Sequence, residues 1–371
     1  MNPVYAAIVL AAIGLVAVTV SMSGTPETQE NGDTESAEAA AYNVTDDGRK
    51  YTVHPSKLVQ GCPGMDCIPS IDSPSFQRAE EAAWLDDRDL VIGLELGGEA
   101  KAYPFRILNV HEIVNDRIAG TPVAVTYCPL CRSGLVYRRI VDGEPTEFGV
   151  SGKLYNANLV MYDRRTETYW SQIEGEAIVG PQVPAELDLV SSVITTWGEW
   201  RDSHPGTVVL SRKTGIYSPR RYGSNPYTSF QRSDRVGFGV DDVDDRLHAK
   251  ELVYGVAAGN ASTAYIEDDI RQVDVINDRV GGLPVLVVED QESGGIRVFD
   301  RTVDGTGMTF AMEGGELVDE NGDRWSFTGE AQEGPHRGEQ LEQLNSHGFF
   351  WFAWSSFHPE TSIYGRGAGD G

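Results

Sequence analysis

The sequence predicts a mostly β protein with a few short helices, arranged as two pseudo-repeated β-rich units that derive from an internal duplication. Two observations support this fold class. Short runs rich in Val, Ile, Tyr and Thr alternate with Gly, Asn and Asp turns through most of the chain, a pattern typical of strands and hairpins. The pattern also recurs at a fixed offset, which is the signature of a repeat. The 371 residues are enough for two domains of ordinary size.

The evidence for the repeat is a series of identical residues that are all spaced 162 positions apart. So many matches at one spacing are not expected by chance. This offset aligns Gly93 with Gly255, Ala102–Tyr103 with Ala264–Tyr265, Asn115–Arg117 with Asn277–Arg279, and Val141–Gly143 with Val303–Gly305. Nearer the end of each unit the offset becomes 154, which aligns Trp197, Trp200 and His204 with Trp351, Trp354 and His358. We therefore expect a first β-rich repeat at residues 51–213 and a second, degenerate one at residues 251–371.

The chain is predicted to begin with a membrane anchor or signal segment at residues 1–24. No side chain from Met1 to Pro26 is charged, and Val4 to Val20 is almost wholly apolar. A helix of that length spans roughly 26 Å, close to the ~30 Å hydrocarbon core, and it exceeds the ~7–15 apolar residues of a signal peptide. We expect an uncleaved anchor, with a cleaved signal as the close alternative. An uncleaved segment makes the membrane a partner, whereas a cleaved one leaves the protein secreted. Either way the rest of the chain is extracytoplasmic.

Residues 25–50 are predicted to form an acidic disordered tether, because Glu27–Glu38 holds too little apolar surface to fold. The first repeat then follows as a series of β-hairpins with glycine or Asn-Asp turns. The expected strand pairs are Val91–Leu96 with Ala100–Tyr103, Ile113–Val114 with Val123–Tyr127, Leu135–Val141 with Thr146–Val150, and Leu159–Tyr162 with Thr168–Gln172.

A short helix is expected from Trp197 to Ser203, capped by Thr195 or Thr196 and ended before Pro205. Residues 214–250 are rich in Tyr, Arg, Ser, Gly and Pro, and we expect them to form a connector on the surface of the two units. The second repeat follows in the same order of elements.

The charge of the chain excludes one class of partner. Acidic residues number 56 and basic residues 30, for a net charge of −26. Such a surface repels phosphate backbones, so nucleic acid is not expected as a partner. The acidity is spread along the whole chain, which favours a halophilic protein kept hydrated in high salt.

The residues most able to do chemistry lie at one turn. Val123–Tyr127 leads into Cys128-Pro-Leu-Cys131, and His111 lies a short way upstream. At the offset of 162, Cys128 becomes Asp290, Cys131 becomes Ser293 and His111 becomes Val273. Because the second repeat keeps the strand and loses the ligand-type residues, we interpret Cys128, Cys131 and His111 as functional additions to a common scaffold.

The residue types favour a soft transition metal. Two thiolates of a Cys-x-x-Cys turn can reach one ion, and an imidazole can join them. Met161 is a candidate fourth ligand, because its match in the second repeat, Leu317, cannot bind a metal. Thiolate, imidazole and thioether together favour copper, Cu(I) especially. A ligand from Glu112 or Asp163 would instead favour zinc or iron.

Cys62 and Cys67 leave three arrangements open. A local disulfide is expected for an extracytoplasmic protein. The pair can also join Cys128 and Cys131 in a four-Cys zinc site, or both pairs can be disulfides with no metal.

Several motifs resemble a family of exported bacterial and archaeal proteins catalogued as domain of unknown function 3179. The resemblance rests on Ala102–Pro104, His111–Asp116, Thr126–Cys131, Phe148–Gly152 and Met161–Arg164, and it covers most of residues 58–365. It implies that Cys128 and Cys131 are the hallmark cysteines of the family. The family pattern has no counterpart of Cys62 and Cys67, which favours an added disulfide there. The family carries no assigned reaction.

Three functions follow as alternatives. The first is metal handling or metal-dependent redox chemistry at Cys128, Cys131, His111 and Met161, with copper favoured. The second is thiol–disulfide exchange by the two cysteines. The third is a non-enzymatic interaction module in which the Cys pair is structural. No Gly-x-Ser-x-Gly elbow and no His-Glu-x-x-His helix supports a hydrolase.

Overall fold

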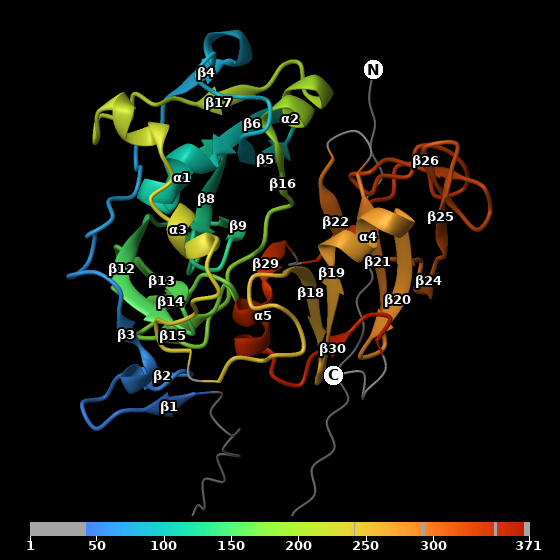
Figure 1. Cartoon of the computed structure of the whole chain (residues 1–371). Coiled ribbons are helices and arrows are strands. Elements are labelled where there is room, and N and C mark those ends of the chain that lie inside the picture. Colours follow the sequence, from blue (N-terminus) through green and yellow to red (C-terminus); the bar gives the residue numbers. More distant parts are fainter. Residues whose placement is uncertain (1–41, 241, 291–293, 345–346, 367–371) are drawn as a thin grey trace, which may run out of the picture. The chain divides into compact units, whose positions relative to one another are not determined.

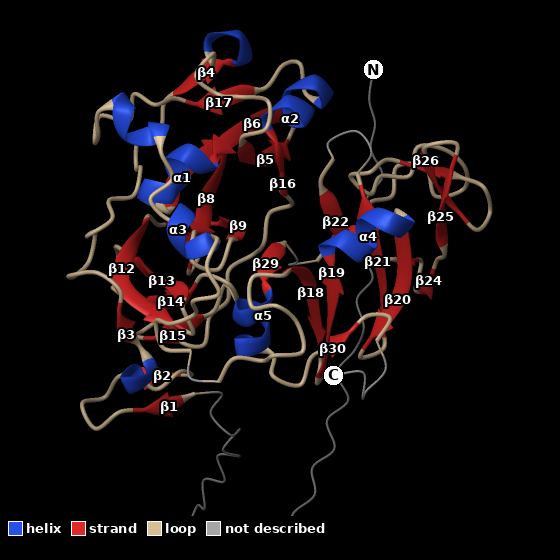
Figure 2. Ribbon diagram, viewed as in Figure 1, coloured by secondary structure: helices blue, strands red, loops and turns tan. Residues whose placement is uncertain are grey.

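The computed structural model describes residues 42–240, 242–290, 294–344 and 347–366, which belong to one compact unit. Most regular structure in these residues is strand, and the helices are short, so the predicted mostly β fold is confirmed (Figure 2). No helix in this part of the chain is long and apolar enough to cross a membrane. The anchor or signal segment expected at residues 1–24 lies outside the described residues.

The first repeat contains three sheets and a small ribbon (Figure 1). One sheet has the order β16 (Val193–Thr196), β5 (Leu90–Leu96), β6 (Glu99–Pro104), β17 (Val208–Leu210), β4 (Phe76–Arg78). The second has the order β7 (Ile113–Ile118), β8 (Thr121–Cys128), β9 (Ser133–Arg138). The third has the order β1 (Asn43–Val44), β2 (Lys50–Tyr51), β15 (Ala177–Val179), β14 (Tyr169–Ser171), β13 (Asn158–Asp163), β12 (Phe148–Tyr155), β3 (Val59–Gln60). The ribbon pairs β10 (Ile140–Val141) with β11 (Glu144–Pro145).

The second repeat has sheets in a matching order, two of them with fewer strands and one with an additional strand. One runs β29 (Gly348–Phe350), β18 (Leu252–Ala258), β19 (Ala261–Ile266), β30 (Ser362–Ile363). The next runs β20 (Val275–Val280), β21 (Leu283–Glu289), β22 (Ile296–Asp300), β28 (Glu342–Gln343). The third runs β25 (Phe310–Glu313), β26 (Glu316–Asp319), β27 (Arg324–Trp325), and a ribbon pairs β23 (Thr302–Val303) with β24 (Thr306–Gly307).

The two repeats share individual hydrogen bonds as well as strand order. Tyr103 donates its hydroxyl to Asp116 at 2.7 Å, and the matching Tyr265 donates to Asp278 at 2.8 Å. The indole of Trp170 donates to a buried Asp at 3.0 Å, and so does the indole of Trp325. These contacts agree with the predicted repeat, while its origin by duplication stays a prediction.

The helix expected after the β-hairpins is confirmed as α2 (Trp197–Ser203). Thr196 caps it in a capping box with Glu199, whose backbone N–H donates to the Thr196 hydroxyl. Its counterpart in the second repeat is α5 (Trp351–Phe357). Sequence reasoning misses two further seven-residue helices, α1 (Phe105–His111) and α4 (Glu267–Val273). Each is two turns long and has no side-chain cap, so no start signal marks it. A third missed helix, α3 (Thr228–Gln231), lies in the connector.

The connector is not a surface segment throughout, which corrects that expectation. It contains the 3-10 turns and short helix between residues 219 and 231, and its Tyr222 is fully buried. Phe230 and Ala249 pack against the largest apolar cluster of the protein, which also holds Cys128, Cys131 and Met161. The two other 3-10 helices are η1 (Pro55–Lys57) and η2 (Ala79–Glu81).

A glycine under a tryptophan ring recurs in both repeats. A Cβ added to Gly93 would lie 2.3 Å from the Trp200 ring, and one added to Gly255 would lie 2.3 Å from the Trp354 ring.

We expect Gly93→Ala and Gly255→Ala each to lower the free energy of unfolding by about 1–3 kcal/mol, because the ring must move out of a packed core. Urea denaturation measures the loss. Gly206→Ala, where the added Cβ meets nothing within 4 Å, is the matched control, and equal stability of all three variants would contradict the expectation.

Candidate functional site

The Cys128–Cys131 turn joins two paired strands of one sheet. Cys128 is the last residue of β8 and pairs with Ser133, the first residue of β9. The Cys131 carbonyl accepts the backbone N–H of Phe350 at 2.9 Å, and the Pro129 carbonyl accepts the side-chain amide of Gln231 at 3.0 Å. A strand, not a helix, follows the second cysteine, so the turn differs from a thioredoxin-type dithiol as the sequence predicts.

The two thiols are free and point to one acceptor. Cys128 and Cys131 are 1% and 0% exposed, and both donate to the Ala157 carbonyl, at 3.7 and 3.3 Å. Ala157 has a φ of 59° and follows Asn156, with a φ of 47°. These two residues form the β12–β13 turn in a conformation that non-glycine residues adopt at a cost. The strained turn therefore places a carbonyl oxygen against both sulfurs.

The two cysteines have opposite shifts in pKa. Burial raises the pKa of Cys128, but hydrogen bonds from the Cys131 thiol and from backbone groups outweigh burial, and the net shift is downward. Burial raises the pKa of Cys131 well above its ordinary value, and the Cys128 thiolate raises it further. Cys128 is therefore the thiol that ionises first, and Cys131 keeps its proton.

Lys250 places a positive charge beside the pair. Its Nζ is buried, has no hydrogen-bond partner among the described residues, and lies 3.5 Å from the centre of the Phe230 ring and 4.4 Å from that of Phe352. Burial lowers the pKa of Lys250 to about 8, while the charge of a Cys131 thiolate acts in the opposite direction. Aromatic faces partly compensate the buried ammonium. A thiolate at this site would give the ammonium its counter-charge.

Glu112 is a buried carboxyl group near Cys128. Burial raises its pKa well above the ordinary value, and a Cys128 thiolate would raise it further. The hydroxyl of Tyr227, from the connector, lies 3.4 Å from its Oε1. Glu112 therefore holds its proton more strongly than an exposed carboxyl group does, and it can donate that proton beside the pair.

His111 is not brought to the cysteines. Its Nδ1 lies 2.7 Å from the Pro69 carbonyl and so donates to it, and its Nε2 lies 2.8 Å from the Tyr222 hydroxyl and accepts from it. Burial lowers the pKa of His111. Within the described residues, only Asp304, His336 and Glu339 form a group of three His, Cys, Asp or Glu ligand atoms within 4.8 Å of one another. The structure thus does not assemble the expected set of Cys128, Cys131 and His111.

The remaining candidate ligands fall into separate places. Met161 is fully buried in β13, in the same apolar cluster as the two cysteines. Asp163 accepts bonds from the Thr166 backbone at 2.7 Å and the Trp170 indole at 3.0 Å, which occupy its oxygens. Cys62 and Cys67 form a disulfide with a Cα–Cα distance of 6.1 Å, which corresponds to the local disulfide expected above.

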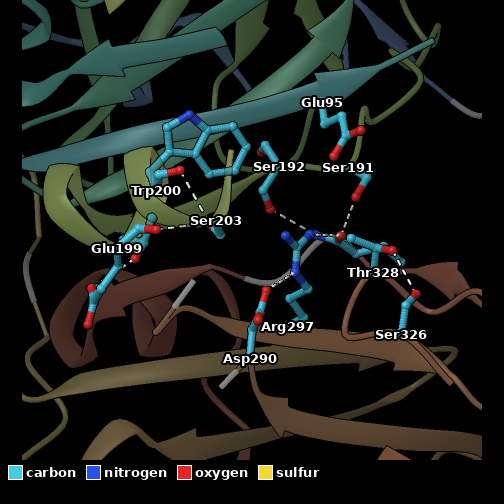
Figure 3. Close-up of polar contacts among 12 residues, drawn as sticks. Glu95, Ser191, Ser192, Glu199, Trp200, Ser203, Asp290, Arg297, Ser326 and Thr328 are labelled. Carbon is cyan, nitrogen blue, oxygen red and sulfur yellow. Dashed lines mark hydrogen bonds and ion pairs between the residues drawn. The ribbon is translucent and has the colours of Figure 1, made fainter. Parts of the chain in front are cut away.

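The second repeat fills the position of Cys128 with a different interaction. Asp290 is 3% exposed and forms an ion pair with the buried Arg297 at 3.2 Å. Figure 3 shows Asp290 pointing toward Arg297, whose guanidinium group lies between Asp290 and the segment with Ser191 and Ser192 of the first repeat. The scaffold therefore does not need sulfur at this place.

Sequence reasoning misses the residues that surround the cysteines. Lys250, Phe230 and Tyr227 all come from the connector, far from the turn along the chain. One signal was available: Lys250 is one of six Lys in the chain and directly precedes the second repeat. Nothing in its spacing points to Cys131.

Arg132, directly after the turn, adopts a left-handed backbone with a φ of 58°. Its match in the second repeat is Gly294, with a φ of 64°. A side chain in this region costs about 1–2 kcal/mol relative to glycine. The first repeat keeps an arginine where the fold favours glycine.

Comparison with known proteins finds one family model. Residues 65–361 match the model described as protein of unknown function (DUF3179). No curated protein and no solved structure matches the chain.

Proposed function

The chain belongs to the family described as protein of unknown function (DUF3179), whose name assigns no reaction, so we propose a function from the chemistry of the Cys128–Cys131 turn. We propose that this pair is a redox-active dithiol that reduces a small disulfide outside the cytoplasm. The observation that carries the proposal is the convergence of two free, buried thiols on one carbonyl, with opposite shifts in pKa.

The opposite shifts in pKa give the two cysteines different roles in the reaction. The Cys128 thiolate attacks one sulfur of the substrate disulfide, which forms a mixed disulfide and releases the other sulfur as a thiolate that takes a proton. Cys131 then loses its proton and attacks the Cys128 sulfur. The Cys128–Cys131 disulfide forms, and the second substrate thiol leaves. Two electrons pass from the pair to the substrate, and both thiol protons end on the products.

Neighbouring groups support both steps. The Lys250 ammonium favours an ionised sulfur beside it, and this matters most when the high-pKa Cys131 must ionise. Glu112 is a buried acid near Cys128 that can protonate a leaving thiolate. The second repeat has no thiol for such groups to assist, because Asp290, paired with Arg297, stands at the position of Cys128.

The burial of the pair favours a small substrate. Sulfurs that are 1% and 0% exposed cannot meet a disulfide on the surface of a folded protein. Tyr127 and Arg132, which flank the turn in sequence, line a pocket of about 400 Å³ that can hold a small molecule next to the turn. The Cys62–Cys67 disulfide supports an oxidising compartment for the chain.

Redox titration of the full-length protein tests the proposal. The protein is equilibrated in mixtures of reduced and oxidised dithiothreitol, trapped with N-ethylmaleimide after denaturation and digested for mass spectrometry. We expect a reversible two-electron transition that forms the Cys128–Cys131 peptide disulfide, and the doubly substituted Cys128→Ser/Cys131→Ser chain lacks it. A pair that stays reduced at every ratio would refute the proposal.

A second candidate is a soft metal site made by the same sulfurs, with Cu(I) favoured and zinc or iron as alternatives. It is supported by Met161, which lies buried in the same cluster, and it does without His111, whose nitrogens are engaged. If Cu(I) binds, competition with bathocuproine disulfonate will show one ion per chain, weaker binding in Met161→Leu and unchanged binding in His111→Gln. A copper affinity equal to that of the double Ser variant would rule this candidate out.

A further inference from the structure

A pocket that is open to solvent lies beside the turn, and two of the three arginines on its wall have no carboxylate partner. It has a volume of about 400 Å³ and lies between helix α1, the residues flanking the cysteines, the start of β5, and the connector. Its walls include Arg88, Arg106, Asn109, Tyr127 and Arg132. Three arginines around one cavity are unexpected in a chain of net charge −26.

Two of the three arginines have no counter-charge. Arg106 is paired with Asp86 at 2.6 Å and with Asp89 at 2.8 Å, which uses the one carboxylate of the cavity wall. Arg132 forms no ion pair with a described residue, and its Nη1 is buried without a hydrogen-bond partner. Arg88, which is exposed to solvent, also forms no ion pair with a described residue. Two guanidinium groups that lack carboxylate partners on the wall of one pocket attract an anion.

The wall also holds an unused acceptor. Asn109 is 4% exposed, and its Oδ1 has no hydrogen-bond partner in the described part of the chain. A buried amide oxygen of this kind is normally paired. A ligand that carries a hydroxyl donor as well as an anionic group would satisfy Asn109 and the two arginines together.

The second repeat closes the matching space with its own residues. At the offset of 162, Asn109 becomes Arg271 and Tyr127 becomes Glu289, and these two form an ion pair. Arg132 becomes Gly294, which suits the left-handed backbone. The first repeat thus replaces an ion pair with two uncharged side chains, which adds no net charge. It also keeps an arginine on a backbone that favours glycine, and this change alone adds a positive charge to the pocket wall.

We propose that this cavity binds a small hydroxylated organic oxyanion, of the sugar phosphate or sugar acid class. The oxyanion lies between Arg132 and Arg88, and a ligand hydroxyl donates to Asn109. A volume of about 400 Å³ is within the range of small-molecule sites. This site does not rest on the dithiol chemistry, because it needs neither sulfur.

Isothermal titration calorimetry of the full-length protein tests the site with four probes: glucose 6-phosphate, gluconate, inorganic phosphate and glucose. We expect at least one of the first two to bind, to bind more tightly than inorganic phosphate, and to weaken as salt is added. Glucose, which lacks the charge, does not bind. The loss of affinity should be about 10- to 100-fold in Arg132→Gly and in Arg88→Gln.

The variants separate a binding role from a folding role. Arg132→Gly places glycine on a backbone that favours it, so the fold is kept while the guanidinium is removed. Arg279→Gln, an exposed arginine of the second repeat, is the matched control and should bind as the native chain does. Cys128→Ser should also bind normally, which keeps this result separate from the dithiol proposal. The site is refuted if neither charged sugar binds, if glucose binds equally, or if Arg132→Gly keeps native affinity.

Discussion

In Cys131→Ser, the remaining thiol at Cys128 should react with methyl methanethiosulfonate at pH 7 about tenfold faster, or more, than the thiol at Cys131 in Cys128→Ser. Both sulfurs are almost fully buried, so access differs little between them. The difference arises from ionisation, because hydrogen bonds lower the pKa of Cys128 and burial raises that of Cys131. A Ser hydroxyl at position 131 can still donate to the Cys128 thiolate and preserve the shift.

The dependence on pH distinguishes the two thiols further. A thiol reacts through its thiolate, so its rate rises with pH up to its pKa and then levels off. For Cys128 the plateau should begin below the ordinary thiol pKa of about 8.5. For Cys131 the rate should still be rising above it. Stopped-flow measurement from pH 6 to pH 10 gives both curves.

Lys250→Met is the informative companion variant. Without the ammonium, the thiolate of Cys131 loses a positive charge that lowers its pKa, so its rate curve should move to higher pH. The Cys128 curve should move less, because hydrogen bonds with Cys131 and backbone groups lower its pKa. If both thiols react equally slowly and with the same dependence on pH, the pair is structural. That result would contradict the proposal that Cys128 attacks the substrate and Cys131 completes the reaction.

The fold could be predicted from local patterns, because hairpins and the repeat leave marks in sequence. Alternation of apolar residues and glycine turns places most strands of the first repeat within a few residues. Helices α1 and α4 could not be found in this way. Each is two turns long, and packing against strands, not a cap or a long apolar stripe, makes it helical (Figure 1).

Of the residues at the site, only Cys128 and Cys131 could be predicted from the sequence. The comparison between repeats isolates Cys128 and Cys131, because it shows which residues the scaffold can lose. It also selects His111, whose loss in the second repeat has another reason. The histidine binds Tyr222 of the connector, and no such connector packs on Val273, which is 55% exposed. Contacts made by a segment about 100 residues away leave no local pattern in the sequence. Lys250 and Tyr227 therefore could not be assigned to the site from the sequence.

Replacing Asp163 with Ala should lower the free energy of unfolding by about 3 kcal/mol or more. The carboxylate is fully buried and accepts the Thr166 backbone N–H at 2.7 Å, the Thr166 hydroxyl at 2.7 Å and the Trp170 indole N–H at 3.0 Å. Removing it leaves the Thr166 backbone N–H and the buried Trp170 indole N–H unpaired, while the Thr166 hydroxyl keeps its hydrogen bond with Thr168. Urea denaturation in the presence of a chelator measures the loss, and the exposed Asp142→Ala is the control.

The same substitution decides between a structural and a metal-binding Asp163. If Asp163 were a zinc or iron ligand, its loss would matter only when the metal is present, and the chelator-treated protein would be unaffected. A structural role predicts an equal loss with and without metal, and unchanged reactivity of Cys128 in the folded protein.

The matching Asp319→Ala should behave alike, because Asp319 accepts the Asn321 backbone N–H at 2.8 Å and the Trp325 indole N–H at 3.0 Å. No cysteine lies in the second repeat, so a similar loss there can come only from the shared Trp–Asp contact. The sulfurs would then be the addition of one repeat, and the Trp–Asp pair part of the framework common to both.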